Sequence, residues 1–437
     1  MFSSPRLENR SRPYRLTAVT GLAALVLAGC HSGSDGAADP ASDVKASADV
    51  IPSKILIGST LPLTGDESPN GQRIKRGYQL AIDQENADGG VELGGRKVPV
   101  ELKLLDDATN KDKAVDLAKR LIVQDKVNFF LGTYSTDLVT VQSTEAELRS
   151  VPYVNAGGAA SSIYSRAYQY VFGVLAPVSN LAGTEMQWID DQVRGGSLPT
   201  PLKVAVVWEN TSHGFDFNQG MRDFVGQRRS EYQIVENSDF QLNQTDYKDI
   251  LKQVRDSQAD VLMVDAHLPD FVKMQKQLLA ADMCLKVVTY GARGSEPAAR
   301  EELKQDGVNY ILSGVWWNNG LGNKGISKDF VTKFKAKYHS DPQWYEAVGY
   351  EAARALMVAI AKAGSANRKK VRDTLATMTM DSLVPGGKLS FPPENGNQAD
   401  YPFVIQQNLP NGTSPIIYPA DVATGNGIAS NPTCKKD

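Results

Sequence analysis

Residues 127–162, VNFFLGTYSTDLVTVQSTEAELRSVPYVNAGGAASS, contain two short apolar runs separated by an amphipathic segment. The runs Val127–Leu131 and Val151–Val154 are rich in β-branched and aromatic residues, which predicts two strands. A helix is expected between them, because apolar residues recur near helical spacing at Leu138, Val141 and Leu148. The stretch therefore predicts a β-loop-α-β unit of an open α/β sheet, in which loops leaving the carboxyl ends of strands line the ligand crevice.

Both loops of this unit are candidates for ligand contact. The first offers the hydroxyls of Ser135 and Thr136, together with backbone N–H groups at the start of a helix, which suit an anion. The second, at residues 155–162, exposes its backbone through side chains too small to cover it. The alternative is that Ser135 or Thr136 only caps the helix.

The N-terminus reads as an export signal. Four arginines precede an uncharged run, Leu16–Leu27, which is too short to span a bilayer comfortably and ends in Leu-Ala-Gly-Cys at 27–30. This pattern predicts a lipoprotein signal peptide at residues 1–29 and acylation of Cys30, the alternative being a cleavable secretory peptide with an incidental cysteine. Residues 30–53 are rich in Ser, Gly, Ala and Asp, so we expect a flexible tether.

Composition narrows the class of partner and the compartment. A net charge of −3 without basic blocks argues against nucleic acid, because phosphate neutralisation needs a concentrated Lys/Arg face. No second apolar run is long enough to span a membrane, so attachment would depend on lipid at Cys30 alone. Cys284 and Cys434 would meet an oxidising compartment, where their pairing is possible and stays open.

Two βα series run along the chain, which predicts two lobes. The length also exceeds that of one ordinary core. Before residue 127, strands are expected at Ile55–Gly58 and around residues 98–104, each followed by a helix. The later elements expected are the strands 204–208, 234–240, 261–264, 287–290 and 308–317, the helices 214–225, 247–254, 269–281, 328–338, 344–363 and 368–377, and short strands at 388–391 and 403–407.

Several motifs resemble cofactor, metal or catalytic sites but lack other residues that such sites require. The sequence Gly-Leu-Gly-Asn-Lys-Gly at 320–325 matches a dinucleotide fingerprint, but no following strand ends in Asp or Glu. The four histidines show no paired zinc spacing, and the acids at 106–112 lack the glycine of a calcium loop. No G-x-S-x-G elbow is present. We therefore expect no enzyme activity, no metal and no cofactor.

Five segments carry a family pattern: residues 57–65 (IGSTLPLTG), 77–81 (GYQLA), 106–107 (DD), 131–135 (LGTYS) and 349–353 (GYEAA). The chain resembles the leucine/isoleucine/valine-binding family of solute receptors, which serve ABC importers, from Ile55 to about Gln407. The resemblance implies two doubly wound α/β lobes of the periplasmic-binding-protein-like I type, joined by a three-crossing hinge near Val174, Gly314 and Gln398. Lobe 1 would comprise residues 54–174 and 315–397, lobe 2 residues 175–314 and 398–420, and the tail residues 421–437.

The resemblance also implies a ligand site in the cleft that closes between the lobes. Relatives hold the ligand's carboxylate with groups that map onto Ser135, Thr136, Gly158 and Ala159. This chain departs from the pattern elsewhere: Asn70 replaces an aromatic, His213 and His267 replace tyrosines, and Arg293 replaces the acid that binds the ligand's ammonium.

These departures argue against a branched-chain amino acid. They predict a polar ligand with a carboxylate or other acceptor near Arg293, because a guanidinium repels an ammonium and grips a carboxylate. The alternatives are that Asp265 or Glu296 supplies the missing acid, or that Arg293 points to solvent or pairs with one of them.

The expected function is that of a lipid-anchored solute-binding protein of an ABC importer, in the periplasm or at the cell surface. It would capture an amino acid or related small polar molecule and deliver it to the permease without chemistry. A sensing receptor of the same fold is the first alternative and a secreted enzyme the second.

Overall fold

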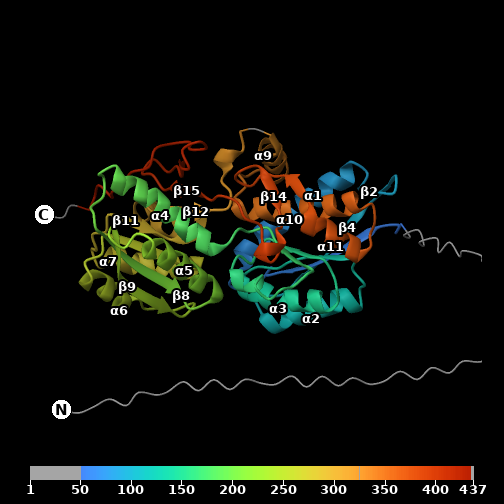
Figure 1. Cartoon of the computed structure of the whole chain (residues 1–437), viewed down its shortest axis with the longest axis horizontal. Helices are drawn as coiled ribbons and strands as arrows, with labels where there is room; N and C mark the ends of the chain where they lie inside the picture. Colours follow the sequence, from blue (N-terminus) through green and yellow to red (C-terminus); the bar gives the residue numbers. More distant parts are fainter. Residues whose placement is uncertain (1–50, 324, 435–437) are drawn as a thin grey trace, which may run out of the picture. The chain divides into compact units, whose positions relative to one another are not determined.

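A computed structural model of the chain describes residues 51–323 and 325–434. The expected signal peptide, Cys30 and the tether as far as residue 50 lie outside the described residues. No helix in the described part is long and apolar enough to cross a membrane. Two open sheets with flanking helices, and two small hairpins, make up the architecture (Figure 1).

The first sheet is entirely parallel, in the order β4-β1-β5-β6-β7. Alternation along its strands places side chains on both faces. In β5, Phe129 and Leu131 join the core formed with α1 and α10, whereas Phe130 joins the core formed with α2 and α3. The strands are β1 (Ile55–Leu61), β4 (Val100–Asp106), β5 (Phe129–Leu131), β6 (Tyr153–Asn155) and β7 (Val171–Gly173).

The second sheet has the order β16-β15-β12-β11-β10-β8-β9. Its five strands from β12 to β9 are parallel, and β15 and β16 add antiparallel strands at one edge. Their bounds are β8 (Leu202–Glu209), β9 (Tyr232–Phe240), β10 (Val261–Asp265), β11 (Val287–Thr289), β12 (Leu312–Val315), β15 (Val404–Gln407) and β16 (Ile416–Tyr418).

Helices associated with the first sheet are α1 (Ser68–Ala87), α2 (Lys111–Val123), α3 (Thr136–Leu148), α9 (Gly325–Tyr338), α10 (Trp344–Ala363) and α11 (Arg368–Thr377). Helices associated with the second are α4 (Val178–Arg194), α5 (Ser212–Gly226), α6 (Lys248–Asp256), α7 (Leu268–Ala280) and α8 (Pro297–Val308). The hairpins are β2 (Val91–Leu93) with β3 (Arg96–Val98), and β13 (Thr379–Asp381) with β14 (Lys388–Ser390).

The chain passes between the sheets three times. It leaves the first sheet after β7, returns after β12, and crosses again between Gln398 and β15. Gln398 is tied to the first sheet, because its amide donates to the carbonyls of Ala159 and Leu175 at 2.9 and 3.1 Å. The molecule is therefore a pair of doubly wound α/β lobes, as the βα pattern predicts, with the three-crossing hinge that the family resemblance implies.

Two helices of the second lobe have no counterpart among the expected elements. On α4 the buried face includes Glu185 and Asp190, which interrupt the apolar stripe that would reveal the helix. On α8 the buried side chains are few, namely Ala299, Leu303 and Val308 beside Gly307. Periodicity is a weak signal where polar groups are buried or the stripe is short.

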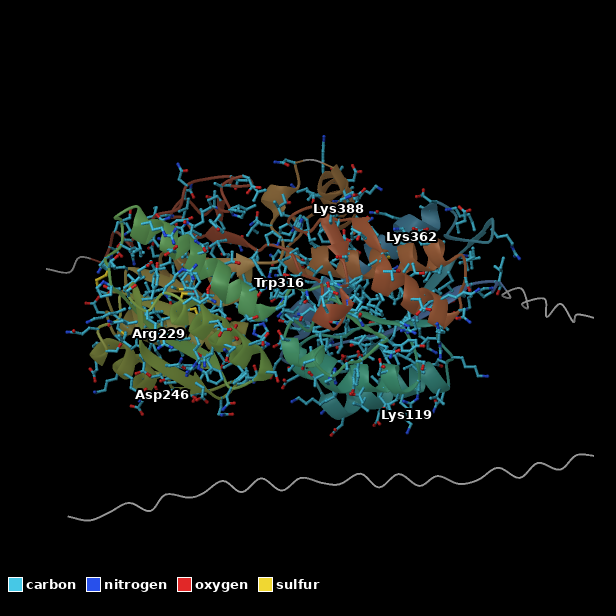
Figure 2. All side chains as sticks on the ribbon, viewed as in Figure 1. Lys119, Arg229, Asp246, Trp316, Lys362 and Lys388 are labelled. Carbon is cyan, nitrogen blue, oxygen red and sulfur yellow. A yellow bond between two sulfur atoms is a disulfide. The ribbon has the colours of Figure 1, made fainter. Side chains whose placement is uncertain are left out.

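The region after residue 408 is more ordered than its loop-rich composition suggests. It supplies β16, and the N–H of Asn431 donates to the carbonyl of Lys286 at 2.8 Å. A disulfide joins Cys434 to Cys284, which resolves the pairing that the sequence left open. Figure 2 shows the side chains: Lys119, Arg229 and Asp246 are exposed, whereas Trp316 is buried.

Candidate functional site

The first wall of the candidate site is built by the loops that follow β5 and β6. Ser135 occupies the N-cap position of α3, but its side chain makes no capping hydrogen bond. Thr136 lies in the first turn, and its hydroxyl oxygen accepts the N–H of Ala159 at 3.4 Å. The hydroxyl of Ser135 therefore stays available to a ligand, because it does not cap the start of this helix.

The two neighbouring glycines of the second loop have different roles. The N–H of Gly158 donates to the side-chain oxygen of Asn155 at 3.0 Å, and a Cβ at this residue would meet Val139 and Ile163. The N–H of Gly157 donates to the same oxygen at 3.4 Å. Gly158 is not among the residues that line the pocket, contrary to expectation, because its Cα faces Val139 and Ile163. Gly157 lines the pocket in its place, next to Ala159.

The second wall contains two histidine–carboxylate pairs. Nδ1 of His213, in the first turn of α5, lies 2.8 Å from Asp265 at the end of β10. Nδ1 of His267, the N-cap residue of α7, lies 2.5 Å from Glu209 at the end of β8. All four side chains are buried.

Both carboxylate oxygens of Glu209 accept hydrogen bonds, and the group is charged. Its Oε2 also accepts the backbone N–H of His267 at 3.0 Å, and its Oε1 accepts the hydroxyl of Thr211 at 2.7 Å. Burial disfavours both charges of the pair, but their mutual attraction and hydrogen bond outweigh it. The pKa of Glu209 is therefore lowered below its ordinary value, and the pKa of His267 is raised well above its ordinary value. His267 is consequently a cation at neutral pH.

Arg293 is buried between the walls, and its donors are mostly unused. Nη2 donates to the hydroxyl of Tyr134 at 2.7 Å, and Nε lies 3.7 Å from Glu296, which accepts the hydroxyl of Tyr345. Nε and Nη1 have no hydrogen-bond partner among the described residues. Arg293 therefore does not point to solvent and does not pair with Asp265. It does form an ion pair with Glu296, one of the alternatives left open by the sequence, although the distance is too long for a hydrogen bond.

One pocket brings these groups together. It is lined by Tyr134, Ser135, Thr136, Gly157, Ala159, Leu175, His213, His267, Arg293, Trp316 and Trp344. The structure thus assembles six of the eight expected residues, leaving out Asn70 and Gly158. The side chains close to a space of about 10 Å³, room for about one water molecule. A ligand could enter only if the lobes part or Arg293 moves away from Tyr134.

Asn70 takes a different position from the one expected. It lies in the first turn of α1, buried, with its amide donating to Oε2 of Glu67 at 3.1 Å. Oε1 of Glu67 in turn lies 3.5 Å from Nε2 of His267. Asn70 therefore does not line the pocket. Because α1 already begins at Ser68, the Asn70 side chain contacts Glu67 in the loop before the helix, and Glu67 in turn contacts His267.

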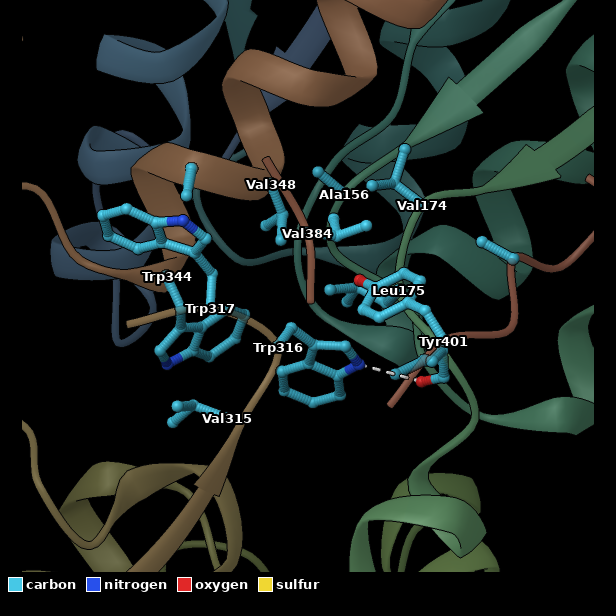
Figure 3. Close-up of a cluster of buried hydrophobic side chains, with 14 of the residues drawn as sticks. Ala156, Val174, Leu175, Val315, Trp316, Trp317, Trp344, Val348, Val384 and Tyr401 are labelled. Carbon is cyan, nitrogen blue, oxygen red and sulfur yellow. Dashed lines mark hydrogen bonds between the residues drawn. The ribbon is translucent and has the colours of Figure 1, made fainter. Parts of the chain in front are cut away.

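Trp316 and Trp344 are lining residues that the sequence did not reveal. The indole N–H of Trp316 donates to the carbonyl of Ala176 at 2.9 Å, and its ring centroid lies 4.8 Å from that of Trp344 (Figure 3). The guanidinium carbon of Arg293 lies 5.5 Å from the centroid of Trp344, within cation–π range. The only available signal was their position at the end of β12 and the start of α10.

Glu209, His213 and Asp265 place three potential metal-ligand atoms within 4.8 Å of one another. His213 Nδ1 already bonds Asp265, and Glu209 already accepts three donors. Hydrogen bonds alone account for this group, so we assign no metal to it.

The chain is similar to known proteins over most of its length. A family model described as periplasmic binding protein matches residues 54–413. The Leu/Ile/Val-binding protein homolog 8 of Brucella abortus (strain 2308) is 27% identical over 316 residues, covering 70% of this chain and 76% of its own.

Two solved structures show the same fold, of the periplasmic-binding-protein-like I type. LivJ of Streptococcus pneumoniae in complex with isoleucine has a TM-score of 0.70 at 19% identity, covering 83% of this chain and 97% of its own. A solute-binding protein of an ABC transporter from R. palustris in complex with benzoate has a TM-score of 0.69 at 20% identity, covering 83% and 94%. The chain belongs to the periplasmic binding protein family.

Proposed function

We propose that the protein is an extracytoplasmic solute-binding lipoprotein of an ABC importer, which captures a small carboxylate between its lobes and delivers it to the permease. The single observation that carries the choice of ligand is Arg293, a buried guanidinium in the interlobe pocket. Its Nε and Nη1 have no hydrogen-bond partner among the described residues, and Glu296 lies 3.7 Å from Nε. A guanidinium can grip a carboxylate with two parallel hydrogen bonds.

The opposite wall supports the same ligand. The hydroxyls of Ser135 and Thr136 and the N–H groups at the start of α3 suit an anion. Isoleucine and benzoate, the ligands of the two structural neighbours, both carry a carboxylate. Tyr134, which now accepts from Arg293, marks where a ligand oxygen would replace the hydroxyl.

Titration calorimetry tests the ligand assignment. The purified receptor would be screened against small carboxylates, beginning with benzoate and isoleucine. For the tightest ligand, Arg293→Ala should weaken binding roughly tenfold to 150-fold, since a hydrogen bond to a charged group contributes about 1.5–3 kcal/mol. Arg229→Ala, at an exposed arginine, is the matched control and should bind as the parent does. A receptor that binds no carboxylate, or an Arg293→Ala variant that keeps full affinity, would refute the assignment.

The anchoring part of the proposal rests on the sequence around Cys30. Cys30→Ala should release the protein from the membrane fraction without lowering its melting temperature, because the tether carries few apolar residues. A variant that still sediments with membranes after a high-salt wash would contradict lipid anchoring.

A further inference from the structure

We propose that the pocket selects carboxylates that lack an α-ammonium group, and that His213 and His267 set this selectivity by occupying the carboxylates of Asp265 and Glu209. The inference rests on the function proposed above and specifies the class of ligand that the same site takes.

The first argument is the lining of the pocket. Its ionisable residues are Tyr134, His213, His267 and Arg293, and no carboxylate lines it within residues 51–323 and 325–434. An ammonium that enters a closed cleft loses its hydration and needs an acceptor or counter-ion in exchange. Here it would instead meet the guanidinium of Arg293 and the charged imidazole of His267.

The second argument is that the acids nearby are already used. Four buried or nearly buried carboxyl groups surround the pocket: Glu67, Glu209, Asp265 and Glu296. Glu209 and Asp265 pair with the histidines, Glu296 accepts the hydroxyl of Tyr345, and Glu67 accepts the amide of Asn70. Each of these acids therefore already has a partner within the protein, and Glu296 is also the ion-pair partner of Arg293 at 3.7 Å.

The third argument concerns direction. Both histidines turn Nδ1 to a carboxylate, and both side chains also line the pocket. Each imidazole therefore lies between the pocket and the acid bound to its Nδ1, and Nε2 of His267 also lies 3.5 Å from Glu67. Removing one imidazole would expose a carboxylate that has lost its partner, and such a buried charge seeks a new cation.

Calorimetry with matched pairs tests the proposal: leucine against 4-methylpentanoate, and phenylalanine against 3-phenylpropanoate. The parent should bind the member without the ammonium at least tenfold more tightly in each pair that binds. His267→Ala should shift the ratio of the two affinities at least tenfold toward the amino acid, and His213→Ala should shift it in the same direction. His339→Ala, at an exposed histidine, should leave the ratio unchanged.

The outcomes separate the two proposals. If the parent binds leucine or phenylalanine as tightly as the analogue, the selectivity inference is overturned while carboxylate capture stands. If neither member of either pair binds and the wider carboxylate panel also fails, the proposed function falls and the inference falls with it. The ratio measured on the parent decides the question even if a histidine variant does not fold.

Discussion

Glu185 on α4 is a buried carboxyl group whose protonation should control stability. Its oxygens accept the N–H of Gly314 at 2.8 Å and the hydroxyl of Thr289 at 2.9 Å. Burial outweighs these hydrogen bonds and raises the pKa of Glu185 from 4.5 to about 8. The folded protein therefore keeps a proton that the unfolded chain releases between about pH 4.5 and 8.

Stability should consequently fall as pH rises through this window, because the unfolded state binds fewer protons there. The contribution of Glu185 is complete below the unfolded pKa and is lost as pH passes the folded value. Glu185→Gln should remove this dependence, by up to roughly 1.4 kcal/mol per pH unit. Urea denaturation of parent and variant at pH 5, 6.5 and 8 measures the effect. If the free energy of unfolding changes with pH in the same way for parent and Glu185→Gln, the Glu185 carboxyl is charged in the folded state.

At the scale of elements, the packing of α1 against α10 depends on glycine. A Cβ at Gly77 would overlap the backbone carbonyl of Glu346 and the backbone nitrogen of Tyr350. Gly77→Ala should destabilise the protein by about 1–3 kcal/mol through overpacking, although alanine is the better helix former. Gly183→Ala on α4, where a Cβ meets nothing within 4 Å, should instead stabilise it by about 0.5–1 kcal/mol. Thermal denaturation of both variants tests this prediction. Equal shifts of the melting temperature would contradict the close contact between α1 and α10.

At the scale of the whole molecule, the two lobes are joined across the cleft by direct hydrogen bonds. Asp216 on α5 accepts both the N–H and the hydroxyl of Ser161, at 3.0 and 2.9 Å. These bonds exist only while the lobes are in contact, so they stabilise the closed state relative to the open one. Ligand affinity should depend on Asp216 even though it does not line the pocket.

Asp216→Ala should therefore weaken binding about five- to thirtyfold, for a loss of about 1–2 kcal/mol, and should enlarge the radius of gyration without ligand. Asp223→Ala, on an exposed part of the same helix, provides the control. Solution scattering with and without saturating ligand, alongside calorimetry, measures both effects. Unchanged affinity and identical scattering profiles for parent and Asp216→Ala would exclude a role in closure.

Local signals in the sequence were sufficient to predict much of the fold. The helices α10 and α11 have the predicted bounds because their ends carry local markers: a capping box at Gln343 and Glu346, left-handed Gly364, and the N-cap Asn367. Loops rich in hydroxyl and small residues follow β5 and β6 as expected, since strand and helix periodicity places them there. The two lobes likewise follow from the repeated βα alternation.

Only the tertiary structure decided which side chains meet. The pairs His213–Asp265 and His267–Glu209 are separated by 52 and 58 residues, and Cys284 and Cys434 by 150. Such contacts depend on strand order and on how two lobes face each other, which local periodicity does not encode. For the same reason the sequence marked Arg293 as a ligand-binding candidate but could not show that its Nε and Nη1 would be buried without a hydrogen-bond partner in the described part of the chain.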